Sequence, residues 1–203
     1  TINRLCASGL SAVARAVQAI QVGDGSVFIA GGVESMTRAP YVMAKPDTAF
    51  SRTPEIFDTS LGWRFINPKM RELFGVDSMG ETAENVALEH GISRADQDAF
   101  ALWSQQKAKQ AQERGRFTRE ITAVSVIDRK GNVSLVDKDE FPRPQTTVET
   151  LAKLKPAFKK DGSVTAGNSS GINDGACALL IVSDKVAKQQ GLSPLARVVS
   201  SAV

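Results

Sequence analysis

The sequence has 203 residues, of which 42% are hydrophobic and 23% are charged, and its formal net charge is +3 at pH 7. These values are ordinary for a globular protein and exclude a chain that is disordered throughout. The charge is compatible with an anionic ligand but is too small to indicate nucleic-acid binding by itself. Two cysteines in this length do not form a disulfide framework, and no apolar run approaches the ~20 residues that span a membrane. We therefore expect a soluble protein of the reducing cytoplasm.

The two ends of the chain resemble cuts within a longer protein. The sequence has no initiator methionine and opens inside an expected strand, and it stops in a second expected strand, Leu195–Val203. Its length is compatible with one large domain or two small ones. No internal repeat and no low-complexity segment interrupts it.

The first thirty residues predict a strand, a helix and a second strand. Thr1–Leu5 has the composition of a short strand, and a helical pattern begins near Ser8. One face of this helix is apolar and the opposite face is polar, with Leu10, Val13, Ala14, Val17 and Ile20 on the first and Arg15, Gln18 and Gln21 on the second. Ser26–Ala30 is continuously apolar, which is typical of a strand buried on both faces. Together these elements predict a right-handed βαβ unit.

Cys6 lies where the first strand gives way to the helix. Free backbone N–H groups and the positive end of the helix dipole both favour an anion there, and such an environment stabilises a nucleophilic thiolate. The small residues Ala7, Ser8 and Gly9 follow, so a substrate could approach the sulfur closely. A buried structural thiol is the competing interpretation, and the local pattern alone leaves the two about equal.

The middle of the chain is irregular at first and then helical. Residues 37–77 show no periodicity, and their length and aromatic content favour a substrate-binding or partner-binding loop. Ser78 and Glu81 are spaced as a capping box for a helix that ends at Gly91, and Ser93 caps a second helix that ends at Gly115. His90, the sole histidine, is expected to be a solvated residue at a helix end. No cluster of residues has the spacing of a metal site.

The last third of the chain predicts a hairpin, a basic segment and a loop of small residues. Strands at 120–127 and 133–136 flank a turn, and a short helix follows at 148–154. Five cations between 143 and 160 form the most basic neighbourhood, either a solvated face or a phosphate contact. The Gly-, Asn- and Ser-rich stretch 164–176 predicts a loop whose backbone can donate hydrogen bonds to a ligand. It leads into a buried strand that carries an inert Cys177, a helix at 184–190 and the final strand.

Four motifs resemble the thiolase family, whose members cleave 3-oxoacyl-CoA or condense two acyl-CoA molecules. They follow one another in the family's order along the whole chain, as Asn3-Arg-Leu-Cys-Ala-Ser-Gly-Leu10, Gly31-Gly-Val-Glu-Ser-Met36, Met79-Gly-Glu-Thr-Ala-Glu-Asn85 and Thr165-Ala-Gly-Asn-Ser-Ser-Gly-Ile-Asn-Asp-Gly175. The segment Thr53–Pro68 is most similar to the 3-oxoadipyl-CoA thiolases of aromatic-compound degradation. The acetyl-CoA acetyltransferase branch shares most of the other motifs, although it often has histidine at the position of Ser78.

The resemblance implies a partial, layered α/β/α thiolase fold. Residues 1–36 would belong to the N-terminal half with the nucleophile helix, 37–160 would be the CoA-binding loop domain, 161–191 would return to the N-terminal half and 192–203 would begin the C-terminal half. Cys6 matches the nucleophile that becomes a thioester. Residues that match the CoA site are Met79, Arg143, Phe158 and Ser170, with Thr150, Ala166 and Gly171 beside them, and Arg143 would lie near the nucleotide phosphates.

The resemblance also implies that the chain is an incomplete enzyme. The family's catalytic histidine, second cysteine and oxyanion-hole asparagine would lie beyond Val203, and His90 and Cys177 do not match them. We therefore expect the parent protein to be an acyl-CoA C-acyltransferase that works through a Cys6 thioester, with CoA as substrate and without a metal. A homodimer or homotetramer is expected, and the 203 residues alone should be almost inactive. The alternative is a non-catalytic module of the same fold that binds CoA or lipid.

Overall fold

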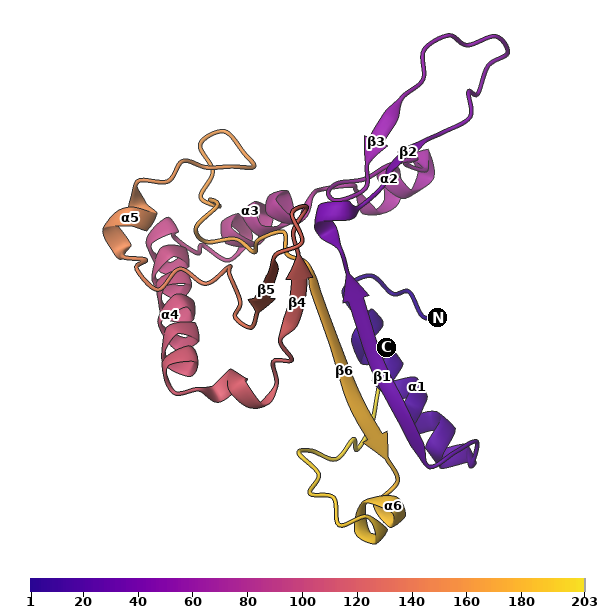
Figure 1. The fold of residues 1–203 in the computed structure, drawn as a ribbon. Helices are drawn as coiled ribbons and strands as arrows, with labels where there is room; N and C mark the ends of the chain where they lie inside the picture. Colours follow the sequence, from indigo (N-terminus) through magenta and orange to yellow (C-terminus); the bar gives the residue numbers. More distant parts are fainter. Residues whose placement is uncertain (203) are drawn as a thin grey trace. The chain divides into compact units, whose positions relative to one another are not determined.

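A computed structural model describes residues 1–202 and divides them into two units (Figure 1). The first unit joins residues 1–38 to the segment that begins at Asn173, and the second unit is Ala39–Ile172. The predicted insertion 37–160 therefore ends later than expected, because residues 161–172 belong to the second unit.

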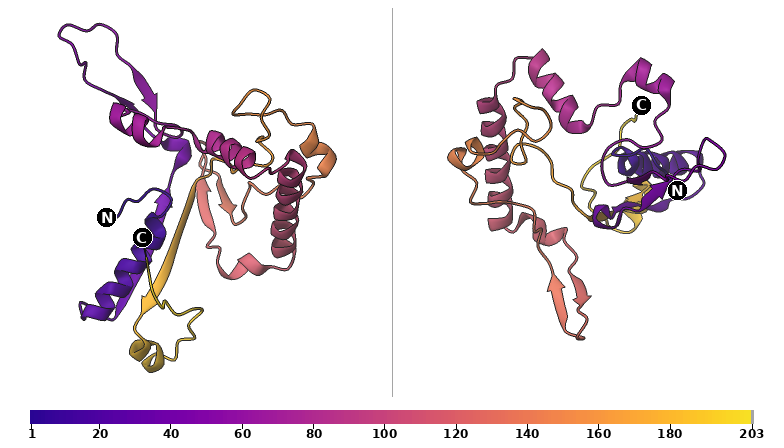
Figure 2. Two further views of the ribbon diagram at one scale, coloured as in Figure 1. Left: turned by 180° about the vertical axis from the view of Figure 1, so that it is seen from behind. Right: turned by 90° about the horizontal axis from the view of Figure 1, so that it is seen from above.

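The first unit is a helix packed along a pair of antiparallel strands. Helix α1 (Ser8–Val22) ends at Gly23, whose left-handed φ of 84° lets its N–H and that of Asp24 bond the last carbonyls of the helix. Strand β1 (Val27–Glu34) pairs with β6 (Gly175–Val182), and Figures 1 and 2 show α1 lying alongside β1. The short helix η1 (Met36–Arg38) follows β1, and α6 (Asp184–Gln189) follows β6 with a cap from Ser183.

The predicted βαβ unit is wrong in two respects. Thr1–Leu5 is not a strand but a local turn, because Leu5 adopts a left-handed φ of 53° and the backbone N–H groups nearby bond side chains instead of a neighbouring strand. Strand β1 finds its partner in β6, far along the chain, and the pairing is antiparallel. The final segment from Leu195 to Ala202 likewise has no strand structure.

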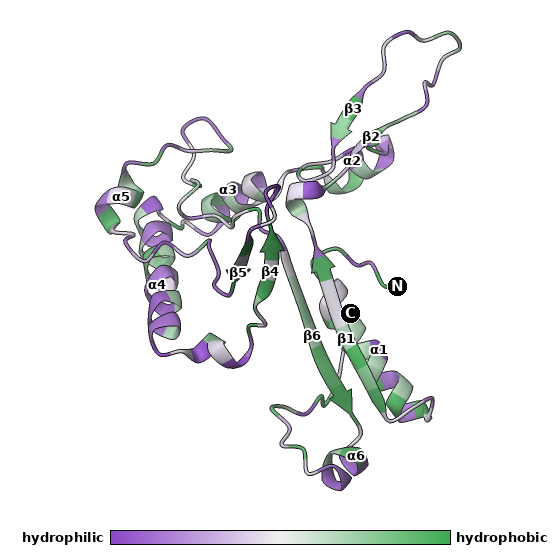
Figure 3. Ribbon diagram, viewed as in Figure 1, coloured by the Kyte–Doolittle hydropathy of each residue, from purple (hydrophilic) through white to green (hydrophobic). Residues whose placement is uncertain are grey.

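The strands of the first unit are more exposed than their composition predicts. Figure 3 shows that β1 and β6 are largely apolar, yet Ala30 is the buried residue of β1, and Ile29 and Leu180 are exposed. Cys177 is exposed as well, which differs from the buried position we expected. By length and composition alone, the stretch Leu5–Val22 is also apolar enough to cross a membrane, a test that a core helix of a soluble protein passes equally. In this structure α1 lies along β1, and Ala16 is its buried residue.

Two helices of the second unit, α3 and α4, begin and end close to where the sequence predicts. Helix α3 (Met79–Glu89) starts with a full capping box between Ser78 and Glu81, and α4 (Arg94–Glu113) starts with one from Ser93. The hydrogen bond from the backbone N–H of Ser78 lowers the pKa of Glu81. Both helices end before glycines with left-handed φ, Gly91 and Gly115. Helix α5 (Val148–Ala152) is shorter than predicted and is capped by Thr147.

The remaining elements of the second unit are small. The hairpin of β4 (Val124–Ile127) and β5 (Val133–Val136) is confirmed, and η2 (Arg116–Arg119) precedes it. The stretch 37–77, expected to be irregular, contains a three-residue pairing of β2 (Tyr41–Met43) with β3 (Ile56–Asp58) and the helix α2 (Pro68–Phe74). These elements are too short to produce a measurable periodicity, and Asn67 with Pro68 forms the one local start signal.

Candidate functional site

Cys6 lies in a tight turn that four hydrogen bonds hold in place. The side chain of Asn3 accepts from the backbone N–H of Leu5 at 3.0 Å, and the backbone N–H of Ala7 donates to the carbonyl of Arg4 at 3.1 Å. Ser8 Oγ donates to the carbonyl of Leu5 at 2.7 Å and accepts from the N–H of Arg4 at 2.8 Å. A left-handed conformation at a leucine is strained, and these bonds maintain it. The turn leaves the thiol exposed at the start of α1.

The N-terminus of α1 has no side-chain cap. A side chain accepts a hydrogen bond at the start of each of the other five α-helices of residues 1–202, from Asn67, Ser78, Ser93, Thr147 and Ser183. At α1 the residue in the capping position is Ala7, which has no acceptor. Near Cys6 the backbone N–H groups of Ala7 and Ser8 donate to the carbonyls of Arg4 and Leu5, whereas those of Gly9 and Leu10 have no partner within residues 1–202 and are available to an anion.

The two family motifs that flank the strand pair are joined at one end of it. Glu34 is the register partner of Gly175, and beyond this pair the backbone N–H and hydroxyl of Thr37 donate to the carboxylate of Asp174 at 2.9 and 2.6 Å. These hydrogen bonds lower the pKa of Asp174, the hydroxyl contributing most. Sequence reasoning placed the two motifs separately and did not find this junction.

Met79 and Phe158, two of the residues expected at a CoA site, come together around Gly80. Met79 is the first residue of α3 and its side chain is 81% exposed. The ring of Phe158 packs directly on Gly80, where a Cβ atom would overlap the ring carbons. Glycine is therefore required at this position for the aromatic ring to lie against the start of the helix.

Arg143 and Gly171 are connected through Phe141. The ring of Phe141 packs on Gly171, and the Arg143 guanidinium lies 5.6 Å from the centre of the same ring. Nη1 of Arg143 donates to the carbonyls of Glu140 and Phe141 at 2.9 and 2.8 Å. The guanidinium thus folds onto its own segment, and its other nitrogens make no hydrogen bond within residues 1–202.

Thr150 has a structural task that the sequence did not reveal. Its hydroxyl donates to the carbonyl of Thr147 at 2.8 Å and accepts from the N–H of Thr147 at 3.0 Å, so it completes the capping box of α5. A CoA contact by this hydroxyl would compete with the cap.

The segment 163–171 carries Ala166, Ser170 and Gly171, and internal bonds use about half of its backbone N–H groups. The N–H groups of Ser163 and Val164 donate to Glu84. Those of Thr165 and Gly167 donate to side chains of the segment, and that of Asn168 donates to a carbonyl of the segment. The N–H groups of Ala166, Ser169, Ser170 and Gly171 have no partner within the described residues. Within 163–171, the backbone N–H groups available to a ligand are therefore those at these four positions.

Four buried or half-buried polar residues that hold this segment were missed by the sequence analysis. Glu84 and Asp98 are only 6% and 3% exposed. Glu84 accepts directly from the segment, whereas Asp98 is bonded to Asn168 of the segment and to Arg94. Burial alone would raise the pKa of Glu84, but hydrogen bonds from Ser163 and Val164 and the charge of Lys159 together lower it. The spacing of Arg94 and Asp98 was the one available signal, and it is equally typical of a surface ion pair.

Other candidates lie apart from these residues. His90 is exposed at the C-terminus of α3, as predicted. No group of three or more His, Cys, Asp or Glu side chains in residues 1–202 could hold a metal ion. An open basic hollow of ≈ 520 Å³ lies between the end of α4 and η2 and contains none of the predicted site residues. Cys6 belongs to the first unit, and the seven expected CoA contacts belong to the second.

Comparison with known proteins identifies the relatives of this chain. Residues 1–185 match the family model "Thiolase, N-terminal domain". The chain is 55% identical to the beta-ketoadipyl-CoA thiolase of Acinetobacter baylyi over 201 residues, which are 99% of this chain and 50% of that protein. It is 47% identical to the acetyl-CoA acetyltransferase of Allochromatium vinosum over 203 residues, covering 100% of this chain and 50% of that protein. The chain thus spans about half the length of the curated relatives it matches.

A solved structure gives the same result at the level of the fold. The crystal structure of human mitochondrial 3-ketoacyl-CoA thiolase in complex with CoA matches with a TM-score of 0.79 and 40% sequence identity. The match covers 96% of this chain and 47% of that one. The expected fold class, part of a thiolase-type α/β fold, is therefore confirmed.

Proposed function

The chain belongs to the thiolase family, and we propose that it is part of an acyl-CoA C-acyltransferase that cleaves 3-oxoacyl-CoA with CoA, or runs the reverse condensation, through a thioester on Cys6. The observation that carries this proposal is the exposed Cys6 thiol at the one uncapped α-helix N-terminus of residues 1–202. A thiol in this place is open to a substrate and lies beside a helix N-terminus, which suits a covalent nucleophile.

The reaction takes place in two half-reactions. The Cys6 thiolate attacks the C3 carbonyl of the substrate, and the bond between C2 and C3 then breaks. Its electron pair remains on C2, which takes a proton and leaves as acetyl-CoA, while the shortened acyl group stays on the sulfur. The thiolate of a second CoA attacks this thioester, and Cys6 leaves as the thiolate. This sequence is a ping-pong mechanism.

The chain supplies the nucleophile but not the groups that move the protons. We place the base and the oxyanion donors in the part of the relatives' length that this chain does not match. Loss of a general base or an oxyanion donor lowers a rate by about 10² or more each. The 203 residues alone are therefore expected to show almost no thiolysis, and measurable turnover by them would refute this assignment.

We propose 3-oxoadipyl-CoA as the substrate. The support is the higher identity to the beta-ketoadipyl-CoA thiolase, 55% against 47% for the acetyl-CoA acetyltransferase, together with serine at position 78. Cleavage of 3-oxoadipyl-CoA by the two half-reactions gives acetyl-CoA and succinyl-CoA. The test is to compare kcat/KM of the full-length protein for 3-oxoadipyl-CoA and acetoacetyl-CoA. A preference for acetoacetyl-CoA would contradict the substrate assignment and leave the reaction class intact.

CoA is proposed to lie in the second unit against the residues that match the family's CoA site. The exposed Met79 and the Phe158 ring at Gly80 would contact the pantetheine arm, and Arg143 would approach the phosphates through the guanidinium nitrogens that its own segment leaves free. Thr150, Ala166, Ser170 and Gly171 complete the proposed site. CoA enters as a substrate, and neither a metal nor a resident cofactor takes part. A cytoplasmic homodimer or homotetramer completes the proposal.

Alkylation of the full-length protein distinguishes the enzyme from the alternative, a non-catalytic CoA-binding module. Iodoacetamide at neutral pH should modify Cys6 faster than Cys177, and CoA should protect Cys6. Incubation with 3-oxoadipyl-CoA should add the mass of a succinyl group to wild type and to Cys177→Ala but not to Cys6→Ala. Both cysteines are exposed, so exposure alone cannot produce the difference. Equal alkylation rates and no acyl adduct would establish the binding module instead.

A further inference from the structure

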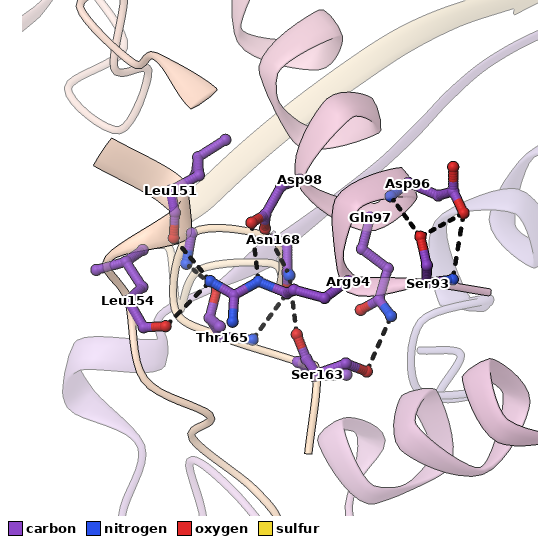
Figure 4. Close-up of polar contacts among 12 residues, drawn as sticks. Ser93, Arg94, Asp96, Gln97, Asp98, Leu151, Leu154, Ser163, Thr165 and Asn168 are labelled. Carbon is purple, nitrogen blue, oxygen red and sulfur yellow. Dashed lines mark hydrogen bonds and ion pairs between the residues drawn. The ribbon is translucent and has the colours of Figure 1, made fainter. Parts of the chain in front are cut away.

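A buried polar cluster holds the segment 163–171 to the helices of the second unit. We define the cluster as Glu84, Arg94, Asp98, Ser163 and Asn168; Figure 4 shows the last four with their partners. It joins α3, α4 and the end of α5 to one loop, although these elements are far apart in the sequence. Every buried side-chain nitrogen and oxygen of residues 1–202 has a hydrogen-bond partner, so the cluster has no unsatisfied atom.

Asn168 is the residue that closes the loop. Its Nδ2 donates to Asp98 Oδ1 at 3.0 Å and to the carbonyl of Ser163 at 3.1 Å. Its Oδ1 accepts from the backbone N–H of Thr165 at 2.7 Å. One side chain therefore fixes two backbone groups of its own loop and attaches that loop to α4.

Asp98 transmits the rigidity of α4 and α5 to Asn168. Its Oδ2 accepts from Arg94 Nε at 2.8 Å, and Arg94 Nη2 donates to the carbonyls of Leu151 and Leu154 at 2.7 and 3.0 Å. The guanidinium thus satisfies carbonyls at the end of α5 while it neutralises Asp98. If the Asp98 carboxylate turned away from Asn168, it would also leave Arg94, and both charges would lose their partner.

The second attachment of the loop is Glu84 on α3. Its carboxylate accepts from the N–H of Ser163 at 2.9 Å and from that of Val164 at 2.8 Å. Gly162 is needed beside it, because a Cβ there would overlap the carboxylate. With one end bound to Glu84 and the middle bound through Asn168, the loop has little freedom up to residue 168. The N–H groups without a partner, at 166 and 169–171, are thereby presented in a fixed arrangement.

We infer that Asn168, acting through Asp98, is a positioning residue that preforms this loop for CoA. The inference rests on the proposed function, since it takes the backbone N–H groups near Ala166 and Ser170 as groups that contact CoA. A preformed loop does not lose conformational freedom on binding, so its ordering free energy does not subtract from the affinity. Loosening the loop should therefore weaken CoA binding and leave the chemistry at Cys6 unchanged.

The test measures the Kd of CoA by calorimetry in the full-length protein and in four variants. Asn168→Ala is expected to bind CoA about tenfold more weakly, because the loop must then be ordered by the ligand. Its kcat at saturating CoA and the alkylation rate of Cys6 without CoA should stay at the wild-type values. The matched control is Asn132→Ala, which also removes an Asn–Asp hydrogen bond (2.8 Å to Asp128) but in the turn between β4 and β5. This control should leave the Kd unchanged.

A pair of exchanged residues tests the contact itself. Asn168→Asp sets two carboxylates against each other and should weaken CoA binding further than Asn168→Ala. Adding Asp98→Asn restores one amide and one carboxylate at the contact, and it should recover part of the affinity. This double variant carries the test if Asn168→Ala does not fold.

The outcomes distinguish a failure of the positioning role from a failure of the proposed function. If the wild-type protein does not bind CoA, the proposed function fails. If wild type binds CoA and Asn168→Ala binds it equally well, or the exchanged pair recovers nothing, the positioning role is overturned and the proposed function stands. A lowered kcat in Asn168→Ala with an unchanged Kd would also overturn it, because the loop would then act on the chemistry rather than on binding.

Discussion

Replacing Glu84 by alanine should release the loop at 163–164. The substitution removes the acceptor of two backbone N–H groups, those of Ser163 and Val164, and of the Ser163 hydroxyl at 3.1 Å. Each buried donor left without a partner costs about 1–3 kcal/mol, so the two backbone groups together should lose about 2–6 kcal/mol of local stability. Since 1.4 kcal/mol is a factor of ten, the amides of Ser163 and Val164 should exchange their hydrogens at least about 30 times faster.

Hydrogen exchange followed by mass spectrometry on the full-length protein measures this effect. Glu89→Ala is the matched control, because Glu89 is an exposed glutamate at the end of the same helix. It should leave exchange at 163–164 unchanged. Exchange in Glu84→Ala that matches this control would refute the reasoning, because it would show that the carboxylate does not hold the loop.

The pH dependence of hydrogen exchange at 163–164 gives a second test of the role of Glu84. The folded-state pKa of Glu84 is lowered below its usual 4.5, so the carboxylate contributes stability that is fully present above that value. This contribution is lost as the pH falls through the folded-state pKa, where the carboxylate takes up a proton. Glu84→Gln cannot titrate, so the difference in exchange between it and wild type should be constant at neutral pH and close below pH 4.5. A difference that persists at low pH would exclude the carboxylate charge as its cause.

Three further substitutions test local features of the fold by thermal or urea denaturation. Ser78→Ala removes the capping box of α3 and should cost about 1 kcal/mol, whereas Thr82→Ala, one turn inside the helix, should cost less. Gly80→Ala forces the Phe158 ring away and should cost about 1–3 kcal/mol of stability, reduced by the higher helix propensity of alanine. Gly9→Ala in α1 is the control, because a Cβ there would meet nothing within 4 Å, and it should stabilise the protein by up to about 1 kcal/mol. Arg94→Lys keeps the charge, but one ammonium group cannot reach Asp98 and two carbonyls together, so the change should cost about 2–3 kcal/mol of stability. A loss as small as that of the control Arg15→Lys would show that these guanidinium hydrogen bonds do not stabilise the fold.

The ends of the helices could be predicted because their signals are local. Ser78 with Glu81, Ser93 and the left-handed glycines at 91 and 115 each act within one turn of the chain. A cap and the N–H that it accepts from are separated by three residues, so spacing alone identifies them. The hairpin β4–β5 was predictable for the same reason, since its strands are joined by a five-residue turn.

Pairings between distant segments could not be predicted in this way. The partner of β1 is β6, and residues 39–172 lie between the chain segments that form their unit. An apolar strand pattern shows that a strand exists, but it does not name its neighbour or its direction. The buried ion pair of Arg94 and Asp98 is hidden for a related reason. Its spacing is that of a surface pair, and its burial depends on α5 and the loop at 168, which only the folded unit brings together.

The two cysteines show why exposure is the weaker guide to chemistry here. Both thiols are exposed, so access to reagent does not distinguish them. Cys177 lies near the start of β6, where Gly32 of β1 is its register partner. Cys6 adjoins the start of α1, where no side chain caps the helix and a strained turn at Leu5 sets the direction of the chain. The difference is that Cys6 adjoins the N-terminus of a helix, whose dipole favours a developing negative charge, whereas Cys177 lies within a strand. The position of Cys6 at the start of α1, and not its accessibility alone, therefore supports the proposal that it is the nucleophile.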